Sequence, residues 1–184
     1  MIKSTVRVLA FMLSALMLLA CTGCGCFTIK PDPDATKAPE ATAAPEDADK
    51  VAFEGVDVFG NPVSMESFAD KKLVMINFWE TWCGPCMGEL PDIEALYEKY
   101  AESGFAVLGV YSSSKASEVR STIEGLGITY TMMQSVAALT KYQTNYVPTT
   151  IFCDGSGNLL TSEPYIGSMS GAEWERIILS LLGE

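Results

Sequence analysis

The sequence predicts an α/β fold in which a mixed β-sheet is flanked by helices and preceded by an N-terminal β-hairpin. Two nearly continuous apolar runs, residues 73–79 and 105–111, have the composition of buried strands. A segment with helical signals follows each run. A strand–turn–strand pattern and an amphipathic segment close the chain. This order of elements predicts a sheet with helices on both faces.

The elements before the second apolar run follow from turn and helix signals. Residues 51–64 are expected to form a short hairpin that turns at Gly60-Asn61-Pro62. A helix is expected from about residue 84 to residue 103. Pro85 suits its first turn, and Pro91 is expected to kink it.

The middle of the chain alternates in the same way. Ser114 is expected to cap a helix over residues 115–126, because a serine oxygen can accept a free N–H of the first turn. Residues 129–133 are expected to form a short edge strand, and residues 136–142 a helical stretch.

The C-terminal part is expected to hold a hairpin and a helix. Residues 149–153 and 159–166 read as strands joined by the Asp/Gly/Ser/Asn-rich turn at 154–158. Ser170 is expected to cap the last helix. That helix carries one apolar stripe, formed by Trp174, Ile177, Ile178, Leu181 and Leu182.

Composition restricts the function. The 184 residues include 23 acidic and 12 basic residues and no histidine. The acidic balance argues against nucleic-acid binding, which needs a basic surface. The missing histidine removes Ser-His-Asp and Cys-His catalysis and histidine metal sites. Six cysteines remain as candidate nucleophiles.

The first twenty residues have the pattern of a secretory signal peptide. Lys3 and Arg7 precede an apolar run, residues 8–20, interrupted only by a serine. As a helix this run spans about 20 Å, less than the ~30 Å hydrocarbon core. The junction Leu18-Leu19-Ala20-Cys21 resembles a bacterial lipobox, so Cys21 is the predicted lipidation site. Lipidation at Cys24 and an uncleaved signal anchor are the alternatives.

Residues 21–50 are expected to be a lipidated N-terminus and a disordered tether. Prolines alternate there with Ala, Thr and acidic residues, and no hydrophobic period is present. Cys24 and Cys26 are interpreted as accessory thiols, because a zinc site would need a fourth ligand nearby. No metal site is predicted. Residues 51–184 are expected to form one domain.

The chemistry is expected at Cys83-Gly84-Pro85-Cys86, where the first buried strand meets its helix. Cysteines three residues apart on a helix are close enough to form a disulfide. Cys83 would face free N–H groups and the positive end of the helix dipole, both of which stabilise its thiolate. Cys86 would resolve a mixed disulfide by attacking Cys83. The alternatives are half of a zinc site and a structural disulfide.

Two motifs resemble a known family. Residues 77–91 (NFWETWCGPCMGELP) are similar to the active site of thioredoxin-fold proteins and, more narrowly, of the membrane-anchored thiol–disulfide oxidoreductases of the TlpA and ResA group. Residues 146–152 (YVPTTIF) are similar to the second conserved motif of that group. The resemblance covers residues 51–184 and implies a thioredoxin-like fold.

The resemblance also implies roles for single residues. Val147–Pro148 would be a cis peptide lying against the cysteines, with Val147 presenting backbone groups to a substrate strand. Trp82 would shield the disulfide and, with Gly84 and Pro85, form part of the docking face. Trp79 is interpreted as a core residue, and Cys153 as a buried, inert thiol.

Asn77 occupies the place of thioredoxin's buried aspartate and cannot titrate. The TlpA/ResA group has a glutamate three residues after its second cysteine, and Glu89 matches it. This spacing would place Glu89 beside Cys86, where it could carry the thiol proton; a solvated helix residue is the alternative. Glu80 departs from the family pattern. It is interpreted as solvent-facing or as an extra negative charge near Cys83 that makes the pair more reducing.

The expected function is an extracytoplasmic, lipid-anchored disulfide reductase that needs no cofactor beyond the Cys83–Cys86 disulfide. The family suggests a membrane electron donor of the CcdA or DsbD type, and targets such as oxidised apocytochrome c or a methionine sulfoxide reductase. Two alternatives remain. One is a peroxiredoxin-like peroxide reductase, because Thr81 precedes Cys83 by two residues. The other is a non-catalytic binding lipoprotein with a structural disulfide.

Overall fold

The computed structural model describes residues 50–184. The predicted signal peptide (1–20), the lipidation site Cys21 and nearly all of the tether therefore lie outside the described residues, and these assignments stay predictions. Within 50–184, no helix is both long enough and apolar enough to span a membrane.

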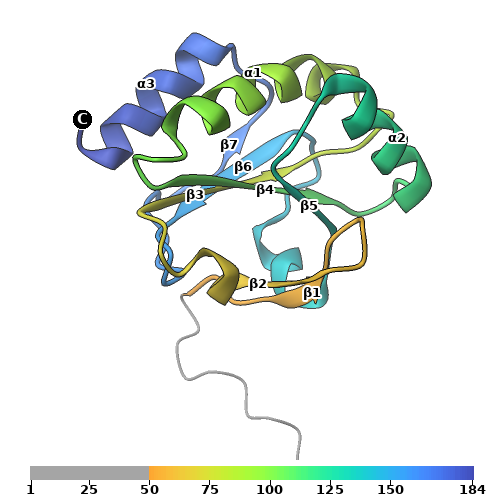
Figure 1. The fold of residues 1–184 in the computed structure, drawn as a ribbon, viewed down its shortest axis with the longest axis horizontal. Helices are drawn as coiled ribbons and strands as arrows, with labels where there is room; N and C mark the ends of the chain where they lie inside the picture. The colour runs from red at the N-terminus through yellow and green to blue at the C-terminus, as the bar shows by residue number, and fades with distance from the viewer. Residues whose placement is uncertain (1–49) are drawn as a thin grey trace, which may run out of the picture. The chain divides into compact units, whose positions relative to one another are not determined.

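A five-stranded mixed sheet forms the centre of the fold (Figure 1). Its spatial order is β5-β4-β3-β6-β7. β3 pairs in parallel with β4 and antiparallel with β6, and all residues of β3 and β4 are buried. The apolar runs therefore form the central strands, as predicted. The bounds are β3 (Leu73–Phe78), β4 (Phe105–Tyr111), β5 (Thr131–Gln134), β6 (Thr149–Cys153) and β7 (Tyr165–Ile166).

The predicted N-terminal hairpin is present as a separate two-stranded sheet. β1 (Glu54–Val56) pairs antiparallel with β2 (Pro62–Ser64). Asp57 organises the connection, since its Oδ1 accepts the backbone N–H groups of Phe59 and Asn61, each at 2.8 Å. A short 3₁₀ helix, η1 (Met65–Phe68), follows directly.

The helices divide between the two faces of the sheet. α1 (Gly84–Tyr100), α2 (Ala116–Leu126) and α3 (Gly171–Leu182) contribute to one buried apolar cluster. The hairpin segment, η1 and η2 (Ala137–Tyr142) contribute to a second cluster. Figure 1 shows α1 and α3 on one side of the sheet and the β1–β2 hairpin on the other. The predicted helices on both faces are present, and those on the hairpin side are short 3₁₀ helices.

Three local predictions need correction. Ser114 does not cap α2: the N-cap position is Lys115, and the Ser114 hydroxyl donates to Glu80 instead. The strand expected over 159–166 is limited to β7 and one isolated bridge at Leu159, and β7 begins directly after Pro164, which has no N–H to donate to a ladder. The first helix ends at Tyr100 rather than at residue 103.

Candidate active site

The two cysteines lie at the junction of β3 and α1. Cys83 is the N-cap residue of α1, and its Sγ accepts the backbone N–H of Cys86 at 3.2 Å. The two form a disulfide with a Cα–Cα distance of 5.3 Å. Cys83 is 5% exposed and Cys86 is fully buried. An attacking group therefore reaches Cys83 first, and the free N–H groups and the dipole of α1 favour its thiolate.

The loop before β6 covers the disulfide. The Val147–Pro148 peptide bond is cis, as the resemblance implied. The carbonyl oxygen of Val147 lies 3.5 Å from the Sγ of Cys83. The backbone of a bound polypeptide could therefore contact Val147 while its sulfur contacts Cys83.

Two exposed aromatic side chains and a cavity adjoin this point. Trp82 and Tyr146 are 69% and 68% exposed, unusual values for such large side chains. Gly84 and Pro85 are also exposed. The cavity has a volume of about 210 Å³. Its lining includes Trp82, Tyr146, Val147, Ser112, Ser113 and Gln143.

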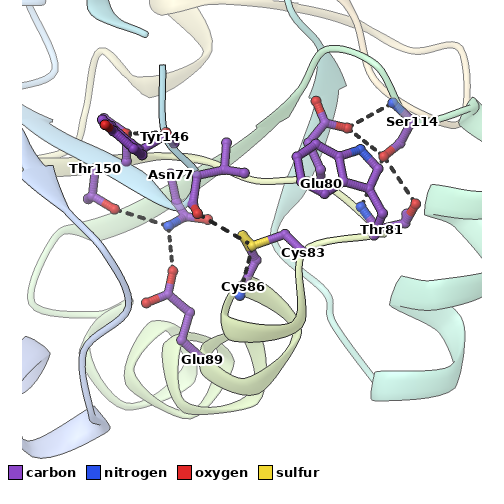
Figure 2. Close-up of a disulfide and its surroundings, with 12 residues drawn as sticks. Asn77, Glu80, Thr81, Cys83, Cys86, Glu89, Ser114, Tyr146 and Thr150 are labelled. Atoms are coloured by element: carbon purple, nitrogen blue, oxygen red, sulfur yellow. Dashed lines mark hydrogen bonds between the residues drawn. A yellow bond between two sulfur atoms is a disulfide. The ribbon is translucent and has the colours of Figure 1, made fainter. Parts of the chain in front are cut away.

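Glu89 is buried beside the disulfide, not solvated. It is 2% exposed, and its Oε1 accepts the side-chain N–H of Asn77 at 3.0 Å. Its Oε2 accepts the indole N–H of Trp174 at 3.3 Å and the backbone N–H of Met169 at 3.2 Å. Figure 2 shows the Asn77 amide between the Glu89 carboxyl group and Thr150. Asn77 therefore connects Glu89 to the sheet.

Burial raises the pKa of the Glu89 carboxyl group above its ordinary value. The hydrogen bonds from Asn77, Met169 and Trp174 act in the opposite direction, but they do not cancel the effect of desolvation. A carboxyl group with a raised pKa accepts and holds a proton more readily than an exposed glutamate, which suits proton exchange with a neighbouring thiol.

Glu80 differs from the solvent-facing interpretation. It is 4% exposed, and its carboxylate accepts hydrogen bonds from the backbone N–H groups of Ser112, Ser113 and Ser114. Burial acts to raise its pKa, but these bonds and the Ser114 hydroxyl outweigh it, so the pKa lies below the ordinary value. Sequence reasoning missed this role because the three donors follow a different strand.

The two structural predictions for single residues are confirmed. Trp79 is fully buried in the core. Cys153 is fully buried on β6, and burial, with the charge of Asp154, raises its pKa to about 12. A thiol in this state is inert at neutral pH. Across residues 50–184, no three His, Cys, Asp or Glu side chains gather in a way that could hold a metal ion.

Several residues that contribute to the site are not predicted from the sequence. The Trp174 and Met169 contacts to Glu89 come from α3 and the loop before it, about eighty positions away. Tyr146 is the one contributor with a local signal, since it directly precedes the Val147–Pro148 motif. This signal locates Tyr146 in the chain but does not predict that its ring is exposed at the cavity.

The fold and the Cys83–Cys86 pair define a thioredoxin-like thiol–disulfide exchange site. The Redoxin family matches residues 33–160, and the chain belongs to this family. It is 28% identical over 144 residues to "Thiol-disulfide oxidoreductase ResA" of Geobacillus kaustophilus (strain HTA426), a match covering 77% of this chain and 81% of that protein. It is 30% identical over 120 residues to "Thioredoxin-like protein YneN" of Bacillus subtilis (strain 168), covering 64% and 69%.

A solved structure agrees with these relatives. The crystal structure of a thiol:disulfide interchange protein of the thioredoxin family from Chlorobium tepidum TLS has a TM-score of 0.66. It is 31% identical in sequence, and the match covers 73% of this chain and 95% of that chain. The protein is therefore a thiol–disulfide oxidoreductase of the ResA type, and the predicted enzyme class and fold are confirmed.

Proposed function

We propose that the protein is an extracytoplasmic disulfide reductase that uses Cys83 as nucleophile and Cys86 as resolving thiol. The observation that carries this proposal is the position of Cys83. It is the N-cap of α1, it is the less buried of the two cysteines, and it lies 3.5 Å from the backbone of the Val147–Pro148 loop. The disulfide itself is the whole redox group in this proposal, and no further cofactor takes part.

The reaction starts from the reduced pair. The Cys83 thiolate attacks one sulfur of a substrate disulfide, forms a mixed disulfide and releases the other substrate sulfur as a thiolate, which takes up a proton. Cys86 then loses its proton and attacks the Sγ of Cys83, which releases the second substrate thiol. The substrate gains two electrons and two protons, and Cys83–Cys86 becomes a disulfide.

Glu89 is the proposed acceptor of the Cys86 proton. It follows Cys86 by three residues on α1, and both side chains are buried. Asn77 cannot titrate, but its amide donates to Glu89 and holds that carboxyl group in place. When the disulfide is reduced again, Glu89 returns the proton.

The electron source and the target are proposed from the family resemblance. A lipid on Cys21 would hold the domain at the outer face of the cell membrane. There a membrane protein of the CcdA or DsbD type would reduce Cys83–Cys86. Oxidised apocytochrome c and an extracellular methionine sulfoxide reductase are the proposed targets.

A two-way exchange experiment tests the direction. The reduced protein is mixed with a synthetic peptide carrying one intramolecular disulfide, and the oxidised protein is mixed with the same peptide in its dithiol form. We expect rapid reduction of the peptide disulfide in the first mixture and little oxidation of the dithiol in the second. Efficient oxidation in the second mixture would show that the protein is an oxidant. If neither mixture exchanges, the Cys83–Cys86 disulfide has a structural role and the proposal is wrong.

A further inference from the structure

Glu80 lies between β3 and the nucleophile Cys83, and the exchange reaction above does not use it. Its two carboxylate oxygens accept four hydrogen bonds. Oε1 accepts the N–H groups of Ser112 and Ser113, each at 2.8 Å, and Oε2 accepts the N–H of Ser114 at 2.8 Å and its hydroxyl at 2.5 Å. All four donors belong to one segment, residues 112–114, which we call the serine loop.

The serine loop in turn contacts the segment that precedes Cys83. The Ser114 hydroxyl oxygen accepts the backbone N–H of Thr81 at 2.9 Å, and Figure 2 shows Glu80, Ser114 and Thr81 in one hydrogen-bonded chain. The Ser113 hydroxyl oxygen accepts the indole N–H of Trp82 at 3.1 Å. Trp82 is 69% exposed, so this bond restrains a large side chain that has few neighbours.

Part of this hydrogen-bonded network lines the cavity beside the disulfide. Glu80, Trp82, Ser112 and Ser113 line one part of it, and the loop that ends at Val147 lines another. Trp82 directly precedes Cys83, and the carbonyl oxygen of Val147 lies 3.5 Å from the Cys83 Sγ, so a polypeptide whose sulfur reaches Cys83 comes close to both residues. The wall that the serine loop supports is therefore part of the surface that such a polypeptide contacts.

We propose that Glu80 is a positioning residue for substrate docking, which holds the serine loop, and through it Trp82, in the geometry that a protein substrate requires. This inference rests on the proposed exchange with protein disulfides. A surface that is ordered before binding avoids the entropy cost of ordering its side chains on binding. Loss of the Glu80 contacts should therefore weaken docking and leave the chemistry at Cys83 unchanged.

The electrostatics support a positioning role. The hydrogen bonds from the serine loop outweigh burial and hold the pKa of Glu80 below its ordinary value, so this carboxylate is ionised at neutral pH. The carboxylate of Glu80 accepts all of its hydrogen bonds from residues 112–114 and none from a sulfur. Glu80 therefore acts through the position of the loop and not as a proton carrier.

A variant with a matched control separates positioning from a general loss of stability. Glu80→Gln keeps the size of the side chain but cannot accept all four hydrogen bonds. Glu94→Gln is the control. Glu94 is also a buried glutamate, 7% exposed, and its carboxylate accepts the N–H and the hydroxyl of Thr129. Glu94 lies on α1, more than two helical turns from Cys86. Ser113→Ala removes only the hydroxyl that accepts the indole N–H of Trp82. Ser113 is exposed, so this variant is expected to fold.

Each reduced protein is reacted in single turnover with two substrates. One is a synthetic peptide with an intramolecular disulfide, and the other is 2-hydroxyethyl disulfide, which has no polypeptide to dock. For Glu80→Gln we expect the half-saturating peptide concentration to rise about ten-fold, because bonds to a charged acceptor are lost. The maximal rate and the rate with 2-hydroxyethyl disulfide should stay within about two-fold. Ser113→Ala should show a smaller rise, and Glu94→Gln none.

Two results would overturn the inference while the proposed reductase function stands. The first is a half-saturating peptide concentration that stays at the wild-type value in both Glu80→Gln and Ser113→Ala. The second is an equal loss of rate with the peptide and with 2-hydroxyethyl disulfide, which would place the effect of Glu80 on Cys83 itself. If the wild-type protein reduces 2-hydroxyethyl disulfide but not the peptide, the proposed protein reductase function fails, and the positioning role fails with it.

Discussion

Replacement of Glu89 by glutamine should change the pH dependence of the resolving step. Glu89→Gln keeps the shape of the side chain and removes its titration. An ordinary thiol with a pKa of about 8.5 is only about 1% thiolate at about pH 6.5, but mostly thiolate at about pH 9. Without a base to accept the proton, release of the substrate thiol should slow by about 10²-fold at the lower pH and by less than about two-fold at the higher pH.

The direction in which the wild-type rate changes with pH follows from the pKa of Glu89. Burial raises this pKa above the ordinary value, and only the ionised carboxylate can accept a proton. The wild-type rate should therefore fall as pH decreases through this raised pKa, and Glu89→Gln should lack that inflection. The assay is the single-turnover rate of peptide thiol release between about pH 5.5 and 9.5, a range that includes the titration of an ordinary thiol.

Two controls accompany this profile. Glu94→Gln, another buried glutamate on α1, should keep the wild-type shape. The alkylation rate of Cys83 should also stay close to wild type in Glu89→Gln, because the N-terminus of α1 is intact. An unchanged profile in Glu89→Gln would refute the proton-carrier role and leave water as the acceptor.

Three further predictions address the cysteines. Cys83→Ala should abolish disulfide reduction, whereas Cys86→Ala should accumulate a mixed disulfide with the peptide, visible by mass spectrometry; normal turnover by Cys86→Ala would exclude the two-cysteine mechanism. Burial raises the pKa of Cys153 to about 12. In the folded Cys83→Ala/Cys86→Ala protein, Cys153 should therefore resist iodoacetamide at neutral pH, and it should react after denaturation. Equal mass shifts before and after denaturation would contradict this. Cys21→Ser should lose palmitate labelling and remain an unprocessed precursor, and labelling at the wild-type level would move the lipid to Cys24 or Cys26.

The central elements could be predicted because their signals are local. The run from Leu73 to Trp79 is short and apolar at nearly every position, which is the pattern of a strand buried on both faces. Cys83 and Cys86 precede and enter a helix, so their spacing permits a disulfide, with half of a zinc site as an alternative. The cis peptide before Pro148 came from the family resemblance and not from the residues.

The surroundings of the two glutamates could not be predicted in the same way. The helical spacing placed Glu89 near Cys86, but its burial depends on Trp174 in α3. Glu80 is a charged residue, and such residues are rarely fully buried unless they are paired. Its partners are backbone N–H groups of residues 112–114, which no side-chain pattern reveals. The position of Ser114 just before α2 predicts a helix cap, but its hydroxyl donates to Glu80, a partner that the local sequence does not reveal.

The most direct test of disulfide exchange at Cys83–Cys86 is the reduction potential of this pair. The purified protein is equilibrated with dithiothreitol buffers of graded ratio, and the fraction of free Cys83 and Cys86 thiols is measured by alkylation and mass spectrometry. We predict a single two-electron transition with a potential above about −300 mV, the range of disulfides that exchange. A potential below about −300 mV would identify a structural disulfide and contradict the assignment of Cys83 as nucleophile.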